Sequence, residues 1–210
     1  MKPPSLETVE RAIGAELLRA RYAYSEREAI LYALGVGAPA NWLAPDELKF
    51  VHELRADFQV LPTFAVIFAK QLHDLVLSGD LAGIQYNPMM LVHGEQQLKL
   101  AKQLPRKAVV DSTVTVADIH DKGSGLLMIL EVTSCDEAGD LLAQARTLMF
   151  IRGIGGFGGE RGQSSTISPP ERPPDAVIEE ATLTRQALIY RLAGDANPQH
   201  LDPQIAAIGK

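Results

Sequence analysis

The segment Leu61-Pro62-Thr63-Phe64-Ala65-Val66-Ile67-Phe68-Ala69 holds the most apolar run of the chain, from Phe64 to Ala69. Pro62 suits the first turn of a helix, because an N–H at that position would have no partner within the helix. The pattern predicts a helix over residues 63–77. A helix that is apolar nearly all round at its start is buried and does not lie on a surface. This segment therefore predicts a central helix enclosed by other elements.

Three segments rich in β-branched and aliphatic residues follow the predicted helix, with turn residues between them. In the first segment Val110, Val114 and Val116 fall on one side of a strand. The segments are Val109–Ile119, Leu126–Ser134 and Leu141–Ile151, joined by the tight connections Asp121–Gly125 and Asp136–Gly139. A long antiparallel meander around one apolar helix predicts an α+β hot-dog fold. The periodicity is also compatible with an ordinary α+β sandwich.

A shorter helix is predicted upstream, and its sequence recurs near the end of the chain. Ser25 and Glu28 have the spacing of a capping box, and Gly35 marks the end of the helix. Arg27–Ala38 can be aligned with Arg185–Ala196 at an offset of 158 residues (185 minus 27), with Arg, Ala, Tyr, Leu and a second Ala matched. Such self-similarity indicates a duplicated unit.

The repeat predicts one complete copy of a fold and the opening of another. Residues 1–159 are predicted to form an N-terminal hot-dog, residues 160–176 a Pro/Ser-rich linker, and residues 177–210 the start of a second hot-dog. Asp195 of the second copy stands where the first copy has Gly37. We therefore expect a first copy that binds and is not catalytic, and a second copy that reacts.

Composition argues against several classes of function. The 210 residues carry a net charge of −6, and their Lys and Arg are scattered, so no nucleic-acid partner is expected. No run approaches the roughly 20 apolar residues that cross a bilayer, so no membrane span is expected. Cys135 is the only cysteine, which leaves no intrachain disulfide.

The strongest functional signal is Tyr190-Arg-Leu-Ala-Gly194-Asp195-Ala-Asn197-Pro198-Gln-His200-Leu-Asp202-Pro203-Gln-Ile-Ala206. A carboxylate and an imidazole supply an acid and a base near neutral pH, and Asn197 can orient a water molecule. The structural alternative is that Asp195 and Asn197 cap backbone N–H groups in Asx-turns. His200 and Asp202 have no third ligand nearby in the sequence, so no metal is expected.

A second motif, Gly153-Ile-Gly155-Gly156-Phe157-Gly158, fits the spacing G-x-G-x-x-G. It leads into a Ser/Pro stretch and not into a helix, so dinucleotide binding is not predicted. With Arg152 and Arg161 beside it, the turn is a candidate for binding phosphate groups of a ligand. A flexible transition from strand to linker is the alternative.

The Tyr190–Ala206 motif resembles the signature of the hydratase 2 (MaoC-like) family of R-specific 2-enoyl-CoA hydratases. Ala193 and Gln199 depart from that signature, although neither is a catalytic position. The resemblance covers nearly the whole chain, through the segments Leu61–Phe64, Leu91–Glu95, Asp118–Gly125, Gly155–Gly159 and Arg172–Ala176.

The resemblance implies a double hot-dog enzyme of fatty-acid metabolism. Such an enzyme adds water syn to a trans-2-enoyl-CoA and yields a (3R)-3-hydroxyacyl-CoA. Asp195 and His200 would share the acid and base work, while Asn197 would help to place the water. The first hot-dog would bind the acyl chain. Further substrate-binding candidates are Pro62, Phe64, His93, Gly94, Arg152, Gly155, Gly156, Phe157 and Gly158.

The same resemblance implies partners and a location. An acyl-CoA is the expected substrate, and no cofactor is expected because CoA is part of that substrate. A homodimer or other self-association is expected. The location is cytoplasmic if the protein is bacterial and peroxisomal if it is eukaryotic, although Ile208-Gly209-Lys210 is not a peroxisomal Ser-Lys-Leu signal.

An alternative function follows from the shortness of the second copy, which stops at Lys210. The chain would then be a truncated acyl-CoA-binding or assembly subunit that needs a partner hot-dog to complete its site. We expect the isolated chain to be a poor hydratase that self-associates. Its aliphatic residues Leu188, Ile189, Leu192 and Ile205 would lie exposed, or dock on the first copy or on another chain.

Overall fold

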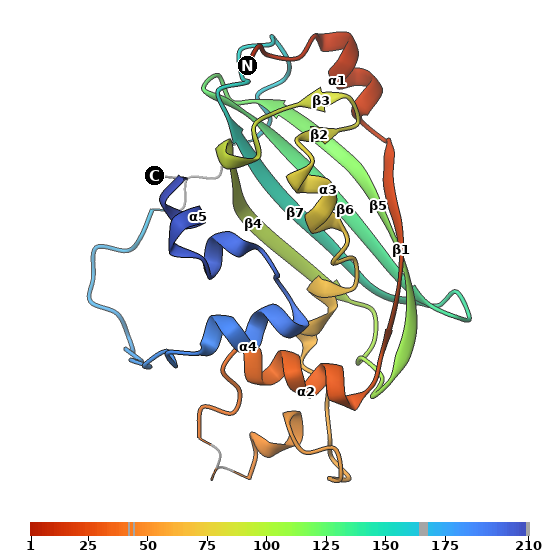
Figure 1. Ribbon diagram of the computed structural model, residues 1–210, viewed down its shortest axis with the longest axis vertical. Coiled ribbons are helices and arrows are strands. Elements are labelled where there is room, and N and C mark those ends of the chain that lie inside the picture. The colour runs from red at the N-terminus through yellow and green to blue at the C-terminus, as the bar shows by residue number, and fades with distance from the viewer. Residues whose placement is uncertain (42, 44, 164–167, 209–210) are drawn as a thin grey trace.

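The computed structural model describes residues 1–41, 43, 45–163 and 168–208. Five strands form one antiparallel sheet in the order β1-β5-β6-β7-β4, with helical segments against one face (Figure 1). The strands are β1 (Glu16–Tyr24), β4 (Leu91–Leu100), β5 (Ala108–Asp121), β6 (Gly125–Asp136) and β7 (Leu141–Arg152). The three predicted strands are confirmed as β5, β6 and β7. The edge strands β1 and β4 complete the sheet.

The helical segments are short and lie before β4 and after β7. The α-helices are α1 (Leu6–Ala12), α2 (Glu26–Gly35), α3 (Leu72–Leu77), α4 (Gln186–Ala193) and α5 (Pro203–Ile208). The 3-10 segments are η1 (Leu48–Phe50), η2 (Pro62–Ile67), η3 (Pro88–Met90) and η4 (Pro198–His200), and β2 (Asp80–Leu81) pairs with β3 (Ile84–Gln85). The predicted capping box at Ser25 and Glu28 starts α2. Within the described residues, no helix has the length and apolar character needed to cross a membrane.

The central helix differs from the prediction, because residues 63–77 do not form one α-helix. They form the 3-10 segment η2, a turn, and then the short helix α3. The side-by-side β-branched Val66 and Ile67 have modest α-helix propensity. Phe64 and Phe68 are both fully buried, and their ring centroids lie 5.6 Å apart. Burial of the apolar run is confirmed, but the type of helix is not.

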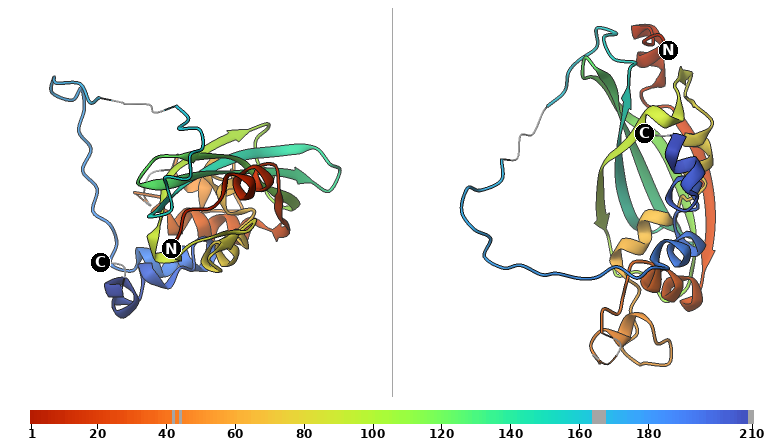
Figure 2. Two further views of the ribbon diagram at one scale, coloured as in Figure 1. Left: turned by 90° about the horizontal axis from the view of Figure 1, so that it is seen from above. Right: turned by 60° about the vertical axis from the view of Figure 1, so that its left-hand side comes forward.

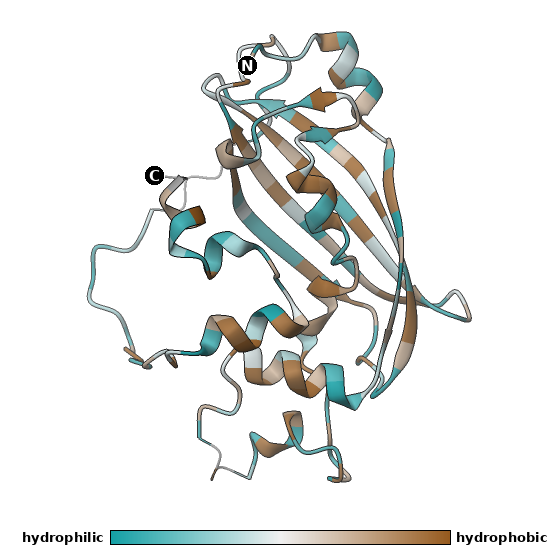
Figure 3. Cartoon of the chain, viewed as in Figure 1, coloured by the Kyte–Doolittle hydropathy of each residue, from teal (hydrophilic) through white to brown (hydrophobic). Residues whose placement is uncertain are grey.

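Aromatic rings fill the space between η2 and the neighbouring elements. Phe64 packs edge-on to Tyr24 at 5.0 Å and to Tyr32 at 5.3 Å between ring centroids. The hydroxyl group of Tyr32 donates to the Thr63 carbonyl oxygen at 3.0 Å, which ties α2 to the start of η2. Figure 3 shows hydrophobic residues gathered where η2, α2 and α4 meet.

The two repeated helices pack directly against each other. Tyr32 of α2 and Tyr190 of α4 are equivalent under the 158-residue offset, and their rings lie 6.0 Å apart. Gln186 donates from Nε2 to the Gly35 carbonyl oxygen at 2.6 Å. A Cβ on Gly35 would lie only 2.9 Å from the Cα of Tyr190, so glycine permits this close approach. The aligned segments are thus neighbours in the fold.

Burial along β5 explains how a carboxylate comes to lie inside the fold. Val110, Val114 and Val116 are fully buried on one face of the sheet, as their even spacing predicts. A register shift between Val116 and Asp118 then moves the inward face to odd-numbered residues. Asp121, at the end of β5, is consequently only 6% exposed.

The Asp121 carboxylate holds the glycine-rich turn against the end of the sheet. Gly123 and Gly156 donate their N–H groups to Oδ1, and Gly158 donates to Oδ2, each at 2.8 Å. The hydrogen bonds from these amides, with that from Gly156 first, hold the pKa of Asp121 below its usual range. The turn is therefore anchored by a buried acceptor at its centre.

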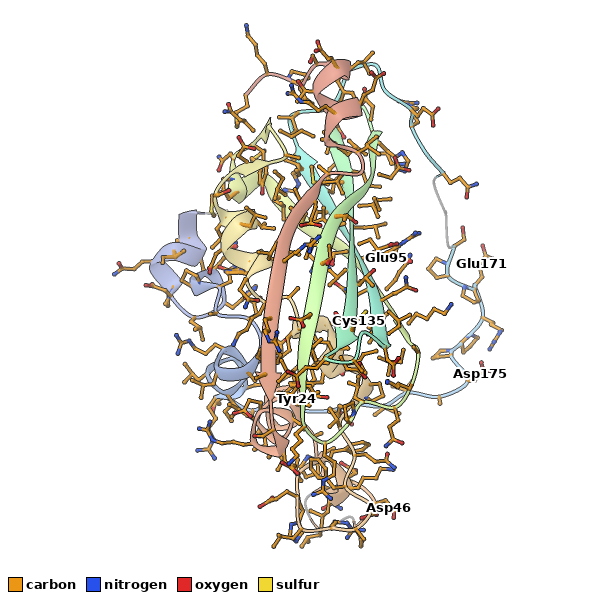
Figure 4. All side chains as sticks on the ribbon, turned by 90° about the vertical axis from the view of Figure 1, so that its right-hand side faces the viewer. Tyr24, Asp46, Glu95, Cys135, Glu171 and Asp175 are labelled. Carbon is orange, nitrogen blue, oxygen red and sulfur yellow. The ribbon has the colours of Figure 1, made fainter. Side chains whose placement is uncertain are left out.

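The segment after this turn runs outside the body of the fold. Residues 164–167 of the predicted linker lie outside the described residues. Residues 168–181 are exposed and hold no helix or strand. They arch away from the sheet before α4 returns to it (Figure 2), and Figure 4 shows Glu171 and Asp175 on this arch. The linker stays a prediction that this path supports.

We predict that Asp121→Asn lowers the thermal unfolding midpoint by several degrees at about pH 7. A carboxylate whose pKa is lowered by folding stabilises the fold above its unfolded-state pKa of about 4. That stabilisation disappears as the pH falls through the lower folded-state pKa. The deficit of the variant should therefore shrink toward about pH 2, as followed by circular dichroism melts.

The matched control for this prediction is Asp111→Asn. Asp111 lies on the same strand, but its side chain is 52% exposed and pairs only loosely with Arg21. This control should change the midpoint little at any pH. If Asp121→Asn lowered the unfolding midpoint equally at about pH 7 and at about pH 2, the stabilising role of the Asp121 charge would be contradicted.

We predict that Gly35→Val detaches α4 from α2, because the new Cβ would meet backbone of Tyr190 that cannot move alone. Residues 186–208 should lose protection from amide hydrogen exchange while β5, β6 and β7 keep theirs. Leu34→Val is the control, since Leu34 is the neighbouring residue and its side chain is 40% exposed. Unchanged protection of residues 186–208 in Gly35→Val would show that the close contact does not hold the helices together.

Candidate active site

The loop after α4 carries the carboxylate of Asp195, the amide of Asn197 and the imidazole of His200, which the motif singles out. The helix ends at Gly194, where a Cβ would come within 2.6 Å of the Tyr190 ring. Glycine therefore lets the chain fold back over that ring. Because α4 is docked on α2, the loop leaves the helix beside α3 of the first unit, where the two share the lining of one cavity.

Two Asx-turns fix the backbone of this loop. Asp195 Oδ1 accepts the N–H of Asn197 at 2.8 Å, and Asn197 Oδ1 accepts the N–H of Gln199 at 2.9 Å. The structural alternative for these two residues is thus realised in the fold. It does not exclude a chemical role, because the first turn uses only one oxygen of the Asp195 carboxylate.

The second carboxylate oxygen faces the imidazole of the same loop. His200 Nε2 lies 3.3 Å from Asp195 Oδ2. The two side chains are 58% and 36% exposed, so a substrate can reach both. Burial raises the pKa of the neighbouring Tyr190 to about 12, so its phenol stays protonated near neutral pH and does not act as the base. Asp195 and His200 therefore form a close carboxylate and imidazole pair that is open to solvent.

One residue near this pair is not indicated by the motif. His73 of α3 places Nδ1 at 3.8 Å from Asp195 Oδ1. His73 lines a cavity of about 220 Å³ whose other lining residues come from residues 70–74 and from residues 191–194 and 196, on either side of Asp195 in the sequence. The one sequence signal for His73 is its position in the predicted helix over residues 63–77.

The glycine-rich turn lies apart from this pair. Gly155, Gly156, Phe157 and Gly158 follow β7 at the end of the sheet near α1, whereas α4 packs at the other end (Figure 1). Arg152, the last residue of β7, lies there too. Two amides of the turn already donate to Asp121. A role in phosphate binding stays a prediction, and the anchoring of the turn is what the structure shows.

The remaining candidates are also placed away from Asp195. His93 and Gly94 lie on the exposed edge strand β4, where His93 Nε2 contacts the Glu95 carbonyl oxygen at 3.2 Å. Phe64 is fully buried among aromatic rings, which makes it a packing residue of the free protein, while Pro62 is exposed at the start of η2. Their roles in substrate binding stay predictions. Of the predicted site residues, the structure brings together Asp195, Asn197 and His200.

No three His, Cys, Asp or Glu side chains gather as a metal site among the residues that the structure describes. The expectation of a metal-free and cofactor-free protein stays a prediction.

Comparison with known proteins places the chain in a family. The family model described as the MFE-2 hydratase 2 N-terminal domain matches residues 22–153. The mouse protein named peroxisomal multifunctional enzyme type 2 is 42% identical over 203 residues, covering 94% of this chain and 27% of the mouse protein. A Dictyostelium discoideum protein named probable enoyl-CoA hydratase 2 is 39% identical and covers 96% of this chain and 68% of its own length.

A solved structure agrees with these relatives. A MaoC-like dehydratase from Phytophthora capsici superposes with a TM-score of 0.82 at 28% identity, over 96% of this chain and 69% of the other. The match confirms the predicted hot-dog fold over the alternative sandwich. The chain spans about a quarter of the mouse protein and about two thirds of the Dictyostelium protein. By its sequence and its fold, the chain belongs to the hydratase 2 family, with the N-terminal domain of that family on residues 22–153.

Proposed function

We propose that the protein is an (R)-specific 2-enoyl-CoA hydratase, which adds water to a trans-2-enoyl-CoA and gives a (3R)-3-hydroxyacyl-CoA. The proposal is supported by the family of the chain and by the Asp195–His200 contact of 3.3 Å in a half-exposed loop. No other carboxylate and imidazole of the described residues combine this contact with the hydratase motif.

The chemistry requires one proton to leave water and one proton to reach carbon. The base removes a proton from water as the water oxygen bonds to C3, and the electrons of the C2=C3 double bond move toward the thioester carbonyl. The acid then delivers a proton to C2, so the net change is addition of H and OH without oxidation or reduction. Two groups that stand 3.3 Å apart serve one face of the planar enoyl group, which favours syn addition.

The positions of the other residues agree with this assignment. Asn197 is held by its own turn next to the carboxylate, where its amide can orient the attacking water. The thioester oxygen gains charge during the reaction, and such charge is stabilised by hydrogen-bond donors already in place.

The mouse relative is named peroxisomal, and we extend that location to this chain only if its source is eukaryotic.

We predict that Asp195→Ala and His200→Ala each reduce hydration of crotonyl-CoA by about 100- to 10,000-fold, the range typical of lost acid or base catalysis. The product of the complete gene should be assayed by loss of the enoyl-thioester absorbance. Circular dichroism should show both variants folded, because neither side chain is buried.

Asp202→Asn is the matched control for these variants. Asp202 lies on the same loop and accepts the N–H of Gln204 at 2.8 Å, a hydrogen bond that the amide oxygen of asparagine can keep. It should retain nearly full activity. Substantial hydration by either Asp195→Ala or His200→Ala would overturn the assigned roles.

A second candidate function, an acyl-CoA-binding or assembly subunit, is favoured by the exposed apolar face of α4. Leu188 and Leu192 of α4 are 56% and 62% exposed beside the half-exposed pair. Ile178, before α4, is 84% exposed. Burying one aliphatic side chain stabilises a contact by roughly 1.5–3 kcal/mol, so this face favours association with another copy or a partner hot-dog.

We predict that the 210-residue chain self-associates and turns over enoyl-CoA weakly. Light scattering of the mass-verified chain should show a species larger than 22.8 kDa, and replacing Leu188 and Leu192 by Glu should shift it to the monomer. Replacement of exposed Leu54, away from α4, by Glu is the control and should leave the association intact. A monodisperse monomer with ordinary turnover would contradict this prediction.

A further inference from the structure

The Asp195 carboxylate lies between two imidazoles that come from different units of the fold. His200 Nε2 approaches Oδ2 at 3.3 Å from the same loop. His73 Nδ1 approaches Oδ1 at 3.8 Å from α3, in the first unit. The His73 side chain is 28% exposed against 58% for His200, so it is the more enclosed of the two rings.

The contacts divide the two carboxylate oxygens between different tasks. Oδ1 receives the N–H of Asn197 and faces His73, while Oδ2 faces His200. A carboxylate turns about its last side-chain bond with little resistance, because that torsion is broad. Two groups on Oδ1 therefore fix which oxygen is presented to His200 and to a substrate.

The distance of 3.8 Å between Nδ1 and Oδ1 is longer than a hydrogen bond. Contacts of catalytic groups in a free enzyme are often long and shorten when substrate binds. The cavity beside the contact is also lined by Lys70, Asp74 and Arg191. The Lys70 ammonium group lies over the Tyr22 ring, with Nζ 5.0 Å from the ring centroid. Among the described residues, only the imidazoles of His73 and His200 lie within ion-pair distance of the Asp195 carboxylate.

We infer that His73 is a positioning residue that aligns Asp195 for the acid and base work. The inference rests on the proposed hydratase function and deepens it, because it makes the first unit a contributor to the reacting loop as well as a support for it. His73 does not need to touch the substrate. It acts by holding Oδ1 so that Oδ2 stays toward His200.

The kinetic test uses His73→Leu and His73→Asn in the product of the complete gene. His73→Leu should lower kcat for crotonyl-CoA by about 10- to 100-fold, because small misplacements of a reacting group carry losses of this size. KM should change less than about 2-fold, since the interaction is with Asp195 and not with substrate. His73→Asn places an amide donor near the position of Nδ1 and should restore most of kcat.

A spectroscopic test does not depend on activity. In long-range proton–nitrogen spectra, the Nδ1 signal of His73 should move when Asp195 is changed to Asn. The same signal should stay in place in Asp74→Asn, which removes a carboxylate from the neighbouring position of α3 that does not pair with His73. His52→Leu, at an exposed histidine away from α3, is the kinetic control and should keep wild-type kcat.

The outcomes separate this inference from the proposed function. A wild-type enzyme with the predicted kcat loss, the rescue by asparagine and the shifted Nδ1 signal would support both. An inactive wild-type protein whose Nδ1 signal still responds to Asp195→Asn would overturn the proposed function and support the contact. An active wild type whose kcat is unchanged in His73→Leu, or whose Nδ1 signal does not move, would overturn the positioning role.

Discussion

The close packing of α4 on α2 is the constraint on which the candidate site depends. At Gly35 a side chain would collide with the backbone of Tyr190, so the two helices meet there without a layer of side chains between them. Tyr32 and Tyr190, equivalent under the sequence repeat, lie with their ring centroids 6.0 Å apart. This docking brings Asp195 within reach of the first unit. Without it, the reacting loop would have no fixed orientation.

The fold can be predicted from the sequence where apolar and polar residues alternate along a strand, because the apolar side is then the buried one. Three segments rich in β-branched and aliphatic residues, separated by turn residues, predict β5, β6 and β7, and the alternating valines of β5 predict its buried face. The central helix was less predictable, because six consecutive apolar residues specify burial and not the tightness of the turn. The edge strand β4 escaped prediction because polar residues face solvent along nearly its whole length, which removes the periodic signal.

In the candidate site, contacts between residues close in sequence could be predicted, whereas contacts between residues far apart in sequence could not. Asp195, Asn197 and His200 are close in sequence, so their proximity could be foreseen from the motif. His73 reaches Asp195 across 122 residues (195 minus 73), and no spacing rule relates them. The glycine-rich turn suggested a ligand, but two of its amides bind Asp121. That carboxylate faces inward only because a register shift in β5 exchanges the two faces of the strand, which the amino-acid pattern alone does not reveal.

We propose that the closely spaced Asp195 and His200, in the loop after the docked helix α4, add water to one face of an enoyl thioester. The most direct measurement is the product of crotonyl-CoA hydration in deuterium oxide, with the configuration at C2 and C3 read by NMR. We expect a (3R)-hydroxyl group and a single deuterium added to C2 from the same face. A (3S) product would contradict the proposed (R)-specificity. Addition to opposite faces would contradict the role of the Asp195 and His200 pair, because two groups that stand 3.3 Å apart cannot serve both sides of a planar substrate.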